Sequence, residues 1–182
     1  MKKVYAFLAT GFEETEAICT IDILRRAGMD VVIISIYNEK TVVGAHNISI
    51  IADKTIDEID PNDADLLFLP GGIPGTPNLE SCEKLMRILD NHIKQNKFVA
   101  AICAAPTILG KRGFLDNKNA ACYPGYENDM GKALCKNSPA IVDGLFITGR
   151  GMGVTTDFAL LIVKTLIGES LANELFQNCI CK

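Results

Sequence analysis

Apolar strand-like segments alternate with amphipathic helical segments along most of this chain, and this alternation restricts its fold more than any other feature. The helical segments carry apolar residues three or four positions apart, whereas the strand-like segments are almost wholly apolar. The strand-like segments are 3–9, 31–37, 65–69 and 98–102. The helical segments are 14–27, 78–97, 104–111, 155–166 and 169–177. Strands that are apolar on both faces predict a mostly parallel sheet covered by helices on both sides.

Two hairpins are expected beside this sheet. One pairs 41–43 with 48–52 around Gly44, and the other pairs 140–142 with 145–148 around Asp143-Gly144, a strong turn signal. A short strand over 119–122 and a helical turn over 127–134 are weaker predictions. Because the chain has no repeat or linker, we predict a single domain over 1–182.

Composition argues against several classes of protein. The net charge is −4 and no basic cluster stands out, so nucleic acid is not an expected partner. No apolar run approaches the roughly 20 residues that span a bilayer, so no membrane is expected either. The apolar stretch after Lys2 and Lys3 is short and runs into Glu13, which favours a buried strand over an export signal and predicts a cytoplasmic protein.

The seven cysteines do not form a recognisable framework. Their odd number and scattered spacing argue against structural disulfides. Only Cys179 and Cys181 are closely spaced, and the two histidines add no helical metal-binding spacing. Two ligands are too few for a structural zinc site. We therefore expect neither a metal nor a cofactor.

Cys103 occupies the most informative local position. It follows the strand-like segment 98–102 and precedes Ala104-Ala105-Pro106 and a helical segment. This order predicts a strand–turn–helix elbow with a thiol at its apex, comparable to the serine elbow of α/β hydrolases. The helix N-terminus is expected to lower the pKa of the thiol and favour the reactive thiolate. The alternative is a small buried cysteine between strand and helix.

Two further features follow strands of the same predicted sheet. The turn Pro70-Gly71-Gly72 exposes backbone amides that, with the amide after Cys103, can form an oxyanion hole; a plain tight turn is the alternative. Glu13, Glu14 and Glu16 begin the first helix, where acidic residues favour the helix dipole. One of them can instead face the thiol, where burial and like charge favour its protonated form. The residues leave open which one does so.

The remaining polar candidates are His46 and Arg150. Both histidines precede Cys103, so the downstream histidine typical of Cys-His-acid amidases is missing. His46 lies in a turn, where it is either simply exposed or reaches a site from another subunit. Arg150 is flanked by glycines, and it either binds an anion or bonds to loop carbonyls.

Taken together, five motifs resemble the ThiJ/PfpI superfamily, and within it the Parkinson's-disease-associated deglycase branch and its bacterial ThiJ-like relatives. The motifs lie at 11–16, 24–28, 69–72, 101–106 and 148–151, so the resemblance covers essentially the whole chain. It implies a flavodoxin-like three-layer α/β/α sandwich, usually homodimeric. It also implies Cys103 as an oxidation-sensitive nucleophile, Glu16 as its carboxyl partner, and the amides of Gly72 and Ala104 as an oxyanion-stabilising pair.

The resemblance also places several other positions near the site. Positions that line the site or bind anions are expected to include Arg26, His46, Gly71, Tyr123 and Arg150. Tyr123 stands where many relatives carry a histidine beside the cysteine, which leaves a proton relay at that position open. His46 stands near a position that is arginine in animal members, which alters anion binding from a partner subunit.

Three functions follow from these residues. The leading hypothesis is a cofactor-free glyoxalase or deglycase that acts on small carbonyl compounds, the α-oxoaldehydes methylglyoxal and glyoxal or their adducts, through Cys103 and Glu16. The second is a redox sensor or chaperone-like stress protein, since an activated thiol oxidises readily. The third is an amidase or peptidase, which the missing downstream histidine disfavours.

Overall fold

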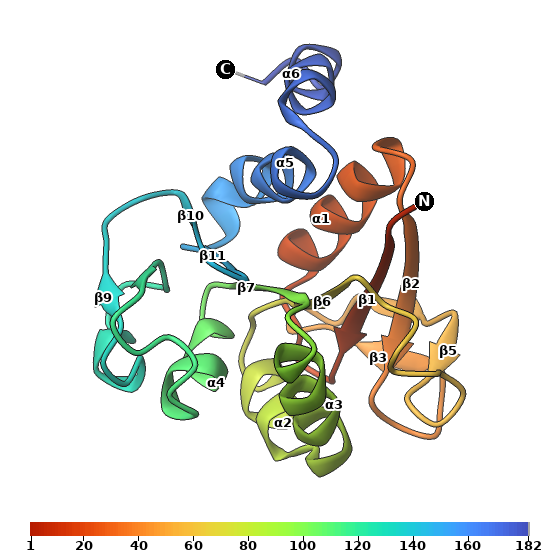
Figure 1. Cartoon of the computed structure of the whole chain (residues 1–182). Helices are drawn as coiled ribbons and strands as arrows, with labels where there is room; N and C mark the ends of the chain where they lie inside the picture. The colour runs from red at the N-terminus through yellow and green to blue at the C-terminus, as the bar shows by residue number, and fades with distance from the viewer. Residues whose placement is uncertain (182) are drawn as a thin grey trace.

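A seven-stranded sheet forms the centre of the molecule. The computed structural model describes residues 1–181 (Figure 1). The strands are β1 (Lys3–Leu8), β2 (Asp30–Ser35), β5 (Lys54–Thr55), β6 (Leu66–Leu69), β7 (Phe98–Ile102), β10 (Ala140–Asp143) and β11 (Phe146–Gly149). They lie in the order β10-β11-β7-β6-β1-β2-β5, and every neighbouring pair is parallel except β10 with β11. The parallel strands β2-β1-β6-β7-β11 follow the flavodoxin-like order 2-1-3-4-5.

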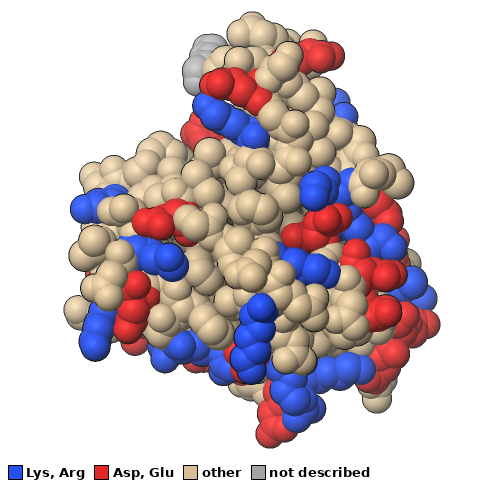
Figure 2. Space-filling model, in the orientation of Figure 1, with Lys and Arg blue, Asp and Glu red and all other residues tan. Residues whose placement is uncertain are grey.

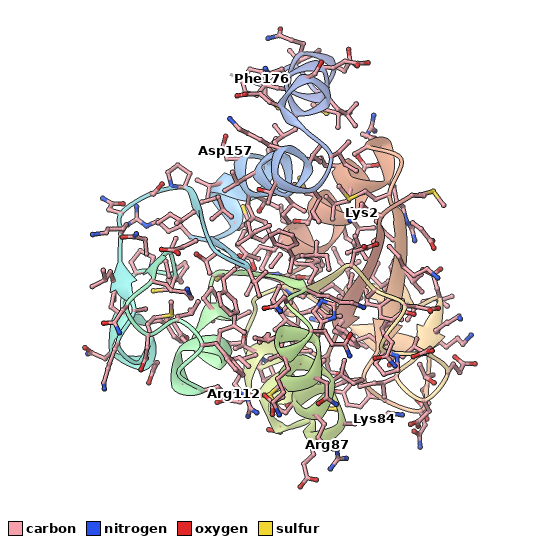
Figure 3. All side chains as sticks on the ribbon, in the orientation of Figure 1. Lys2, Lys84, Arg87, Arg112, Asp157 and Phe176 are labelled. Atoms are coloured by element: carbon pink, nitrogen blue, oxygen red, sulfur yellow. The ribbon has the colours of Figure 1, made fainter. Side chains whose placement is uncertain are left out.

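Helices cover both faces of this sheet. On one face α1 (Glu14–Arg26) packs against α5 (Thr155–Leu166), and α6 (Glu169–Asn178) packs on α5. On the other face lie α2 (Gly75–Ser81), α3 (Glu83–Lys94) and α4 (Pro106–Lys111). Figure 1 shows the two groups above and below the sheet, and Figure 3 shows Asp157 and Phe176 at the opposite end of the molecule from Lys84 and Arg87. The predicted three-layer α/β/α sandwich is confirmed.

Strand β1 shows why the sheet is sandwiched. Val4, Ala6 and Leu8 pack into the core under α1 and α5, whereas Tyr5 and Phe7 pack into the core under α3 and α4. Side chains of a strand alternate between the two faces, so an apolar residue at every position requires cover on both sides.

The predicted hairpins are confirmed as antiparallel pairs. β3 (Thr41–Val43) pairs with β4 (Ser49–Ile51), and β10 pairs with β11. A small parallel pair, β8 (Asn119–Ala120) with β9 (Leu134–Cys135), flanks the main sheet. Two 3₁₀ turns complete the chain, η1 (Glu127–Asp129) and η2 (Met152–Val154).

Two predictions of local structure were wrong or incomplete. The single helix expected over 78–97 is two helices, α2 and α3, which are separated at Cys82 by extended backbone with φ −78° and ψ 94°. Because the apolar spacing continues across the break, the sequence pattern does not indicate where α2 ends and α3 begins. The two-residue strands β5 and β9 were not predicted, because β5 is polar and both are too short to show a period.

The length and hydropathy of the helices and the mixing of surface charges agree with what the composition predicts. Within residues 1–181, none of the helices is both long and apolar enough to cross a membrane. On the face shown in Figure 2, Lys and Arg side chains are interspersed with Asp and Glu side chains.

Candidate active site

Three segments that are distant in sequence meet at the carboxyl edge of the parallel sheet. Glu16 lies in the first turn of α1, after β1; Gly71 and Gly72 follow β6; Cys103 follows β7. The sheet order reverses between β1 and β6, and crevices at such a switch point are where open α/β sheets bind ligands. The topology therefore assembles the candidate site.

Cys103 has an unusual backbone conformation. Its φ is +65°, in the left-handed region that residues other than glycine seldom adopt. Two hydrogen bonds hold it there: its amide donates to the Gly149 carbonyl at 2.9 Å, and its carbonyl accepts from the Tyr123 amide at 2.8 Å. The expected elbow is present, and residues in such a conformation cluster at functional sites.

Gly71 allows the thiol and the carboxyl to approach each other. A Cβ atom at this position would lie 2.6 Å from Cys103 Cβ and 2.6 Å from Glu16 Oε2. The Gly71 amide also donates to Glu16 Oε2 at 2.9 Å. Gly72 has φ +101°, and a Cβ there would lie 2.4 Å from the Glu13 amide nitrogen. The Gly-Gly turn is therefore required by close packing as well as by conformation.

The three glutamates of the first helix have different contacts. Glu13 caps α1, because its Oε2 accepts from the Glu16 amide at 2.6 Å. Glu14 binds the hairpin beside it, where the His46 amide donates to Oε1 at 2.6 Å and His46 Nδ1 lies 2.8 Å from Oε2. Glu16 is 1% exposed, and its carboxyl is hydrogen-bonded to the Cys103 thiol. Glu16 is thus the glutamate that faces the thiol.

Burial and mutual contact shift both groups. Burial raises the pKa of Glu16 to about 7, against the hydrogen bonds from Cys103 and the Gly71 amide. Burial raises the pKa of Cys103 to about 12, with a further increase from the Glu16 charge and hydrogen bond. The amides of Ala104 and Gly72 hydrogen-bond to the sulfur and act in the opposite direction. The amide at the helix end therefore acts in the predicted direction, but burial and the carboxylate outweigh it, so the net pKa shift is upward and the expected low pKa of Cys103 is wrong.

These shifts describe a pair that shares a proton. The first proton leaves near the Glu16 pKa of about 7, and the second leaves only near the Cys103 pKa of about 12. Between these values the pair holds one proton and one negative charge. The higher pKa of Cys103 places this proton on sulfur, so the resting pair is a thiol beside a carboxylate that can accept its proton.

A shallow cavity lies next to the pair. It has a volume of about 260 Å³ and is lined by Tyr123, Pro124, Arg150, Gly151, Met152, Gly153 and Val154. It adjoins the pair through Tyr123, whose amide bonds to Cys103, and through Gly151, where an added Cβ would lie 4.0 Å from Glu16 Oε1. Pro124, Met152 and Val154 were not predicted; the glycine run 149–153 was the available signal.

Comparison with known proteins shows which family this chain belongs to. The model of the DJ-1/PfpI family matches residues 2–165. The chain belongs to the DJ-1/PfpI family. The ThiJ/PfpI resemblance is therefore confirmed.

Relatives agree over nearly the whole chain. Protein DJ-1 homolog B of Arabidopsis thaliana is 37% identical over 175 residues, which are 95% of this chain but 40% of that protein. The chain thus spans less than half the length of this relative. Glutathione-independent glyoxalase DJR-1.2 of Caenorhabditis elegans is 30% identical over 93% of this chain and 91% of its own. A crystal structure of a DJ-1 superfamily protein from Salmonella typhimurium has a TM-score of 0.94 and 33% identity, covering 99% of this chain and 98% of that one.

Arg26 does not lie at the site of this DJ-1/PfpI protein. It is the last residue of α1, ten residues after Glu16 and about 15 Å further along the helix axis. Its Nε donates to Asp22 at 2.6 Å on the exposed surface. Within one chain Arg26 is thus away from the Cys103–Glu16 pair, and its role in anion binding stays a prediction.

Neither His46 nor Arg150 has a hydrogen bond to the Cys103 thiol. The His46 side chain is 71% exposed and bonds to Glu14. Arg150 donates to the Asn137 side chain, and its amide donates to the Pro139 carbonyl. His92 Nε2 bonds to the carbonyl of Phe98, which begins β7, so it lies toward the opposite edge of the sheet. Within residues 1–181 of one chain, neither His46 nor His92 contacts Cys103.

One group of side chains has the composition of a metal site. Ligand atoms of Glu13, Glu14 and His46 lie within 4.8 Å of one another, the only such group among residues 1–181. The side chains of this group already form hydrogen bonds: Glu13 caps α1, and Glu14 bonds to His46. Those contacts account for the group without a metal ion.

Proposed function

We propose that this protein is a cysteine-dependent, cofactor-free glyoxalase or deglycase that acts on α-oxoaldehydes such as methylglyoxal and glyoxal, or on their adducts. The observation that carries this proposal is the contact of the buried Glu16 carboxyl with the Cys103 thiol, beside the amides of Gly72 and Ala104. A glutathione-independent glyoxalase among the relatives supports the same reaction. The cavity of about 260 Å³ suits a small carbonyl compound.

The first step uses the shared proton. The Cys103 thiolate attacks the aldehyde carbon and forms a C–S bond, while the carbonyl π electrons move to oxygen. The amides of Gly72 and Ala104 donate to the developing oxyanion. Glu16 then gives its proton to that oxygen, which yields a neutral hemithioacetal and an ionised carboxylate. No external base is needed for this step.

The second step uses the carboxylate that the first step produced. Glu16 removes the proton from the former aldehyde carbon and returns it to the neighbouring carbon, while the hydroxyl proton on the former aldehyde oxygen passes to the neighbouring carbonyl oxygen, which converts the hemithioacetal to a thioester. Water then cleaves the thioester, so methylglyoxal plus water becomes lactate and the thiol is regenerated. Burial suits Glu16 to this work, because a pKa of about 7 lets it both donate and accept a proton near neutral pH.

The test is a matched set of variants assayed for methylglyoxal loss and lactate formation. Cys103→Ser removes the nucleophile, and we expect no lactate above the uncatalysed rate. Cys82→Ser removes a thiol at the junction of α2 and α3, away from the site, and serves as the control. Lactate formation at the wild-type rate in Cys103→Ser would rule out this mechanism.

A second function is favoured by the same contacts. A sulfenate or sulfinate on Cys103 would accept hydrogen bonds from the Gly72 and Ala104 amides and from protonated Glu16, so the site also suits a redox-sensing thiol. We expect mild peroxide to add oxygen to Cys103 before the other cysteines. Intact-mass analysis with peptide mapping checks this order, and oxygen appearing first on any other cysteine would remove the sensing role.

We also propose that the protein forms a homodimer, and apolar residues beside the site mark the surface. Ile18 on α1 and Ile48 and Ile51 on the β3–β4 hairpin are exposed by 39%, 55% and 76%. The Ile48 amide lies 3.5 Å from Glu14 Oε1, which brings the hairpin against α1. Sedimentation analysis should show a dimer for the wild type and a monomer for Ile51→Lys; a wild-type monomer would contradict this proposal.

A further inference from the structure

A second pair of thiols lies outside the Cys103–Glu16 site. Cys135 is in β9 and is the register partner of Ala120 in β8, while Cys122 lies two residues beyond Ala120. The two thiols line the same cavity, and Cys135 is near enough to raise the pKa of Cys122. Thirteen positions separate the two cysteines in sequence, so the β8–β9 pairing brings them together.

A polar cavity gives small molecules access to this pair. It has a volume of about 210 Å³ and is lined by Cys122, Glu127, Cys135, Lys136, Asn137 and Arg150. Cys122 is 6% exposed, whereas Cys135 is only partly buried. Cys135 is thus the thiol that a reagent entering the cavity meets first.

We propose that Cys122 and Cys135 form a redox-active dithiol that a hydroperoxide converts to an intramolecular disulfide. The Cys135 thiolate attacks the outer oxygen of the hydroperoxide, which gives Cys135 sulfenic acid and releases an alcohol, or water from hydrogen peroxide. The Cys122 sulfur then attacks the Cys135 sulfur and displaces hydroxide, which leaves as water with the Cys122 proton. Two thiols lose two electrons and the hydroperoxide gains them.

The environment of Cys122 favours a disulfide over further oxidation. Burial and the neighbouring Cys135 raise the pKa of Cys122 to about 12, while Arg150 acts in the opposite direction. Cys122 is therefore a neutral thiol, and the disulfide that replaces it is also uncharged, whereas a sulfinate would place a charge in this buried position. The resolving sulfur is already beside Cys135, so it can capture the sulfenic acid before a second hydroperoxide arrives.

The dithiol is connected to the mouth of the first site. Tyr123 follows Cys122 directly, and its amide donates to the Cys103 carbonyl at 2.8 Å. Arg150 lines both cavities. Even so, the proposed disulfide needs nothing from Cys103, so it stands or falls independently of the glyoxalase proposal.

Trypsin makes a direct test possible. Cleavage after Lys118, Lys132 and Lys136 places Cys122 on the peptide 119–132 and Cys135 on the peptide 133–136. Cys103→Ser protein is treated with stoichiometric hydrogen peroxide, its free thiols are alkylated, and the denatured protein is digested without reductant. We expect the two peptides to appear joined, two hydrogen atoms lighter than their sum, from protein that runs as a monomer on a non-reducing gel.

Matched variants and one contrary result complete the test. Cys135→Ser in the same background should return peptide 119–132 fully alkylated, whereas Cys82→Ser should retain the joined peptides. Because Cys103 lies on a separate peptide, 98–111, mapping of the wild type gives the same answer if Cys103→Ser fails to fold. Recovery of Cys135 as sulfinic acid, or of both cysteines as alkylated thiols after the peroxide is consumed, would overturn the proposal.

Discussion

Burial raises the pKa of Cys103 and of Cys122 to a similar extent, but the two thiols have different neighbouring groups. Burial is the largest cause of the raised pKa at each, and both reach about 12. Cys103 is in contact with a carboxyl group and two backbone amides, whereas the main neighbour of Cys122 is a second thiol, with Glu127 and Arg150 also near it. A carboxyl partner supplies a mobile proton, and a thiol partner supplies a second reducing group. The partner, more than burial, thus determines which chemistry each cysteine can perform.

The sharpest test of this comparison removes each thiol in turn. We expect Cys103→Ser to abolish methylglyoxal conversion, because no other group near Glu16 can form the covalent intermediate. Cys122→Ser should retain most of the activity, since Cys122 lies outside the Cys103–Glu16 pair and lines a different cavity. Lactate formation by the two purified variants measures the difference. Equal losses would mean that the two thiols belong to one functional unit.

The next effect concerns the carboxyl partner. Glu16→Gln should lower kcat/KM by about 100- to 10,000-fold, which is the usual contribution of a positioned acid–base group. The same change should lower the pKa of Cys103 from about 12, because it removes the adjacent charge. Alkylation of Cys103 as a function of pH, followed on peptide 98–111, measures this shift, with alkylation of Cys122 as the internal reference. An unchanged Cys103 profile would show that Glu16 does not act on the thiol.

A smaller effect should appear in stability against pH. The folded-state pKa of Glu16 is about 7, above its ordinary value of 4.5, so the folded protein binds this proton more tightly. That contribution is complete below pH 4.5 and is lost as the pH rises through about 7, amounting to about 3 kcal/mol. Between these limits the wild type should lose stability relative to Glu16→Gln.

Urea denaturation of both proteins across this pH range checks the prediction. The pKa of buried His92 is lowered to about 4, so His92 gives the opposite trend over an overlapping range, with stability lost as the pH falls. Its contribution cancels in the difference between wild type and variant. Parallel stability curves would show that Glu16 is not a buried acid in the folded protein.

The smallest expected effect is at Arg26, which lies in neither thiol environment. Arg26→Ala breaks an exposed ion pair with Asp22, and such solvent-screened pairs contribute little to stability. We expect activity to be unchanged and the midpoint of urea denaturation to move only slightly. A large drop in lactate formation by this variant would place Arg26 in the functional site after all.

Most of the sheet could be predicted from the sequence, because apolar strands with amphipathic helices between them allow few arrangements. The elbow at Cys103 was predicted for the same reason. The break at Cys82 was not, since the apolar spacing of α2 continues into α3. Local sequence patterns therefore predict where helices and strands lie, but they do not predict where a helix is interrupted.

The site was only partly predictable. The residues alone did not distinguish Glu16 from Glu13 and Glu14, because the choice depends on how α1 lies against β6 and β7. The direction of the Cys103 pKa shift was wrong because it reflects burial and a carboxylate brought from another segment. The contact between Cys122 and Cys135 depends on the path of the chain between them, which has no periodic pattern to reveal it.

The absence of a side chain at residue 71 has a practical consequence. The Glu16 carboxyl and the Cys103 side chain occupy the space that a methyl group at residue 71 would fill. The backbone of this turn therefore sets the distance between them. Altering the reach of the pair for a bulkier substrate therefore requires rebuilding the turn after β6. Exchanging Cys103 or Glu16 for a longer or shorter residue would leave that backbone unchanged.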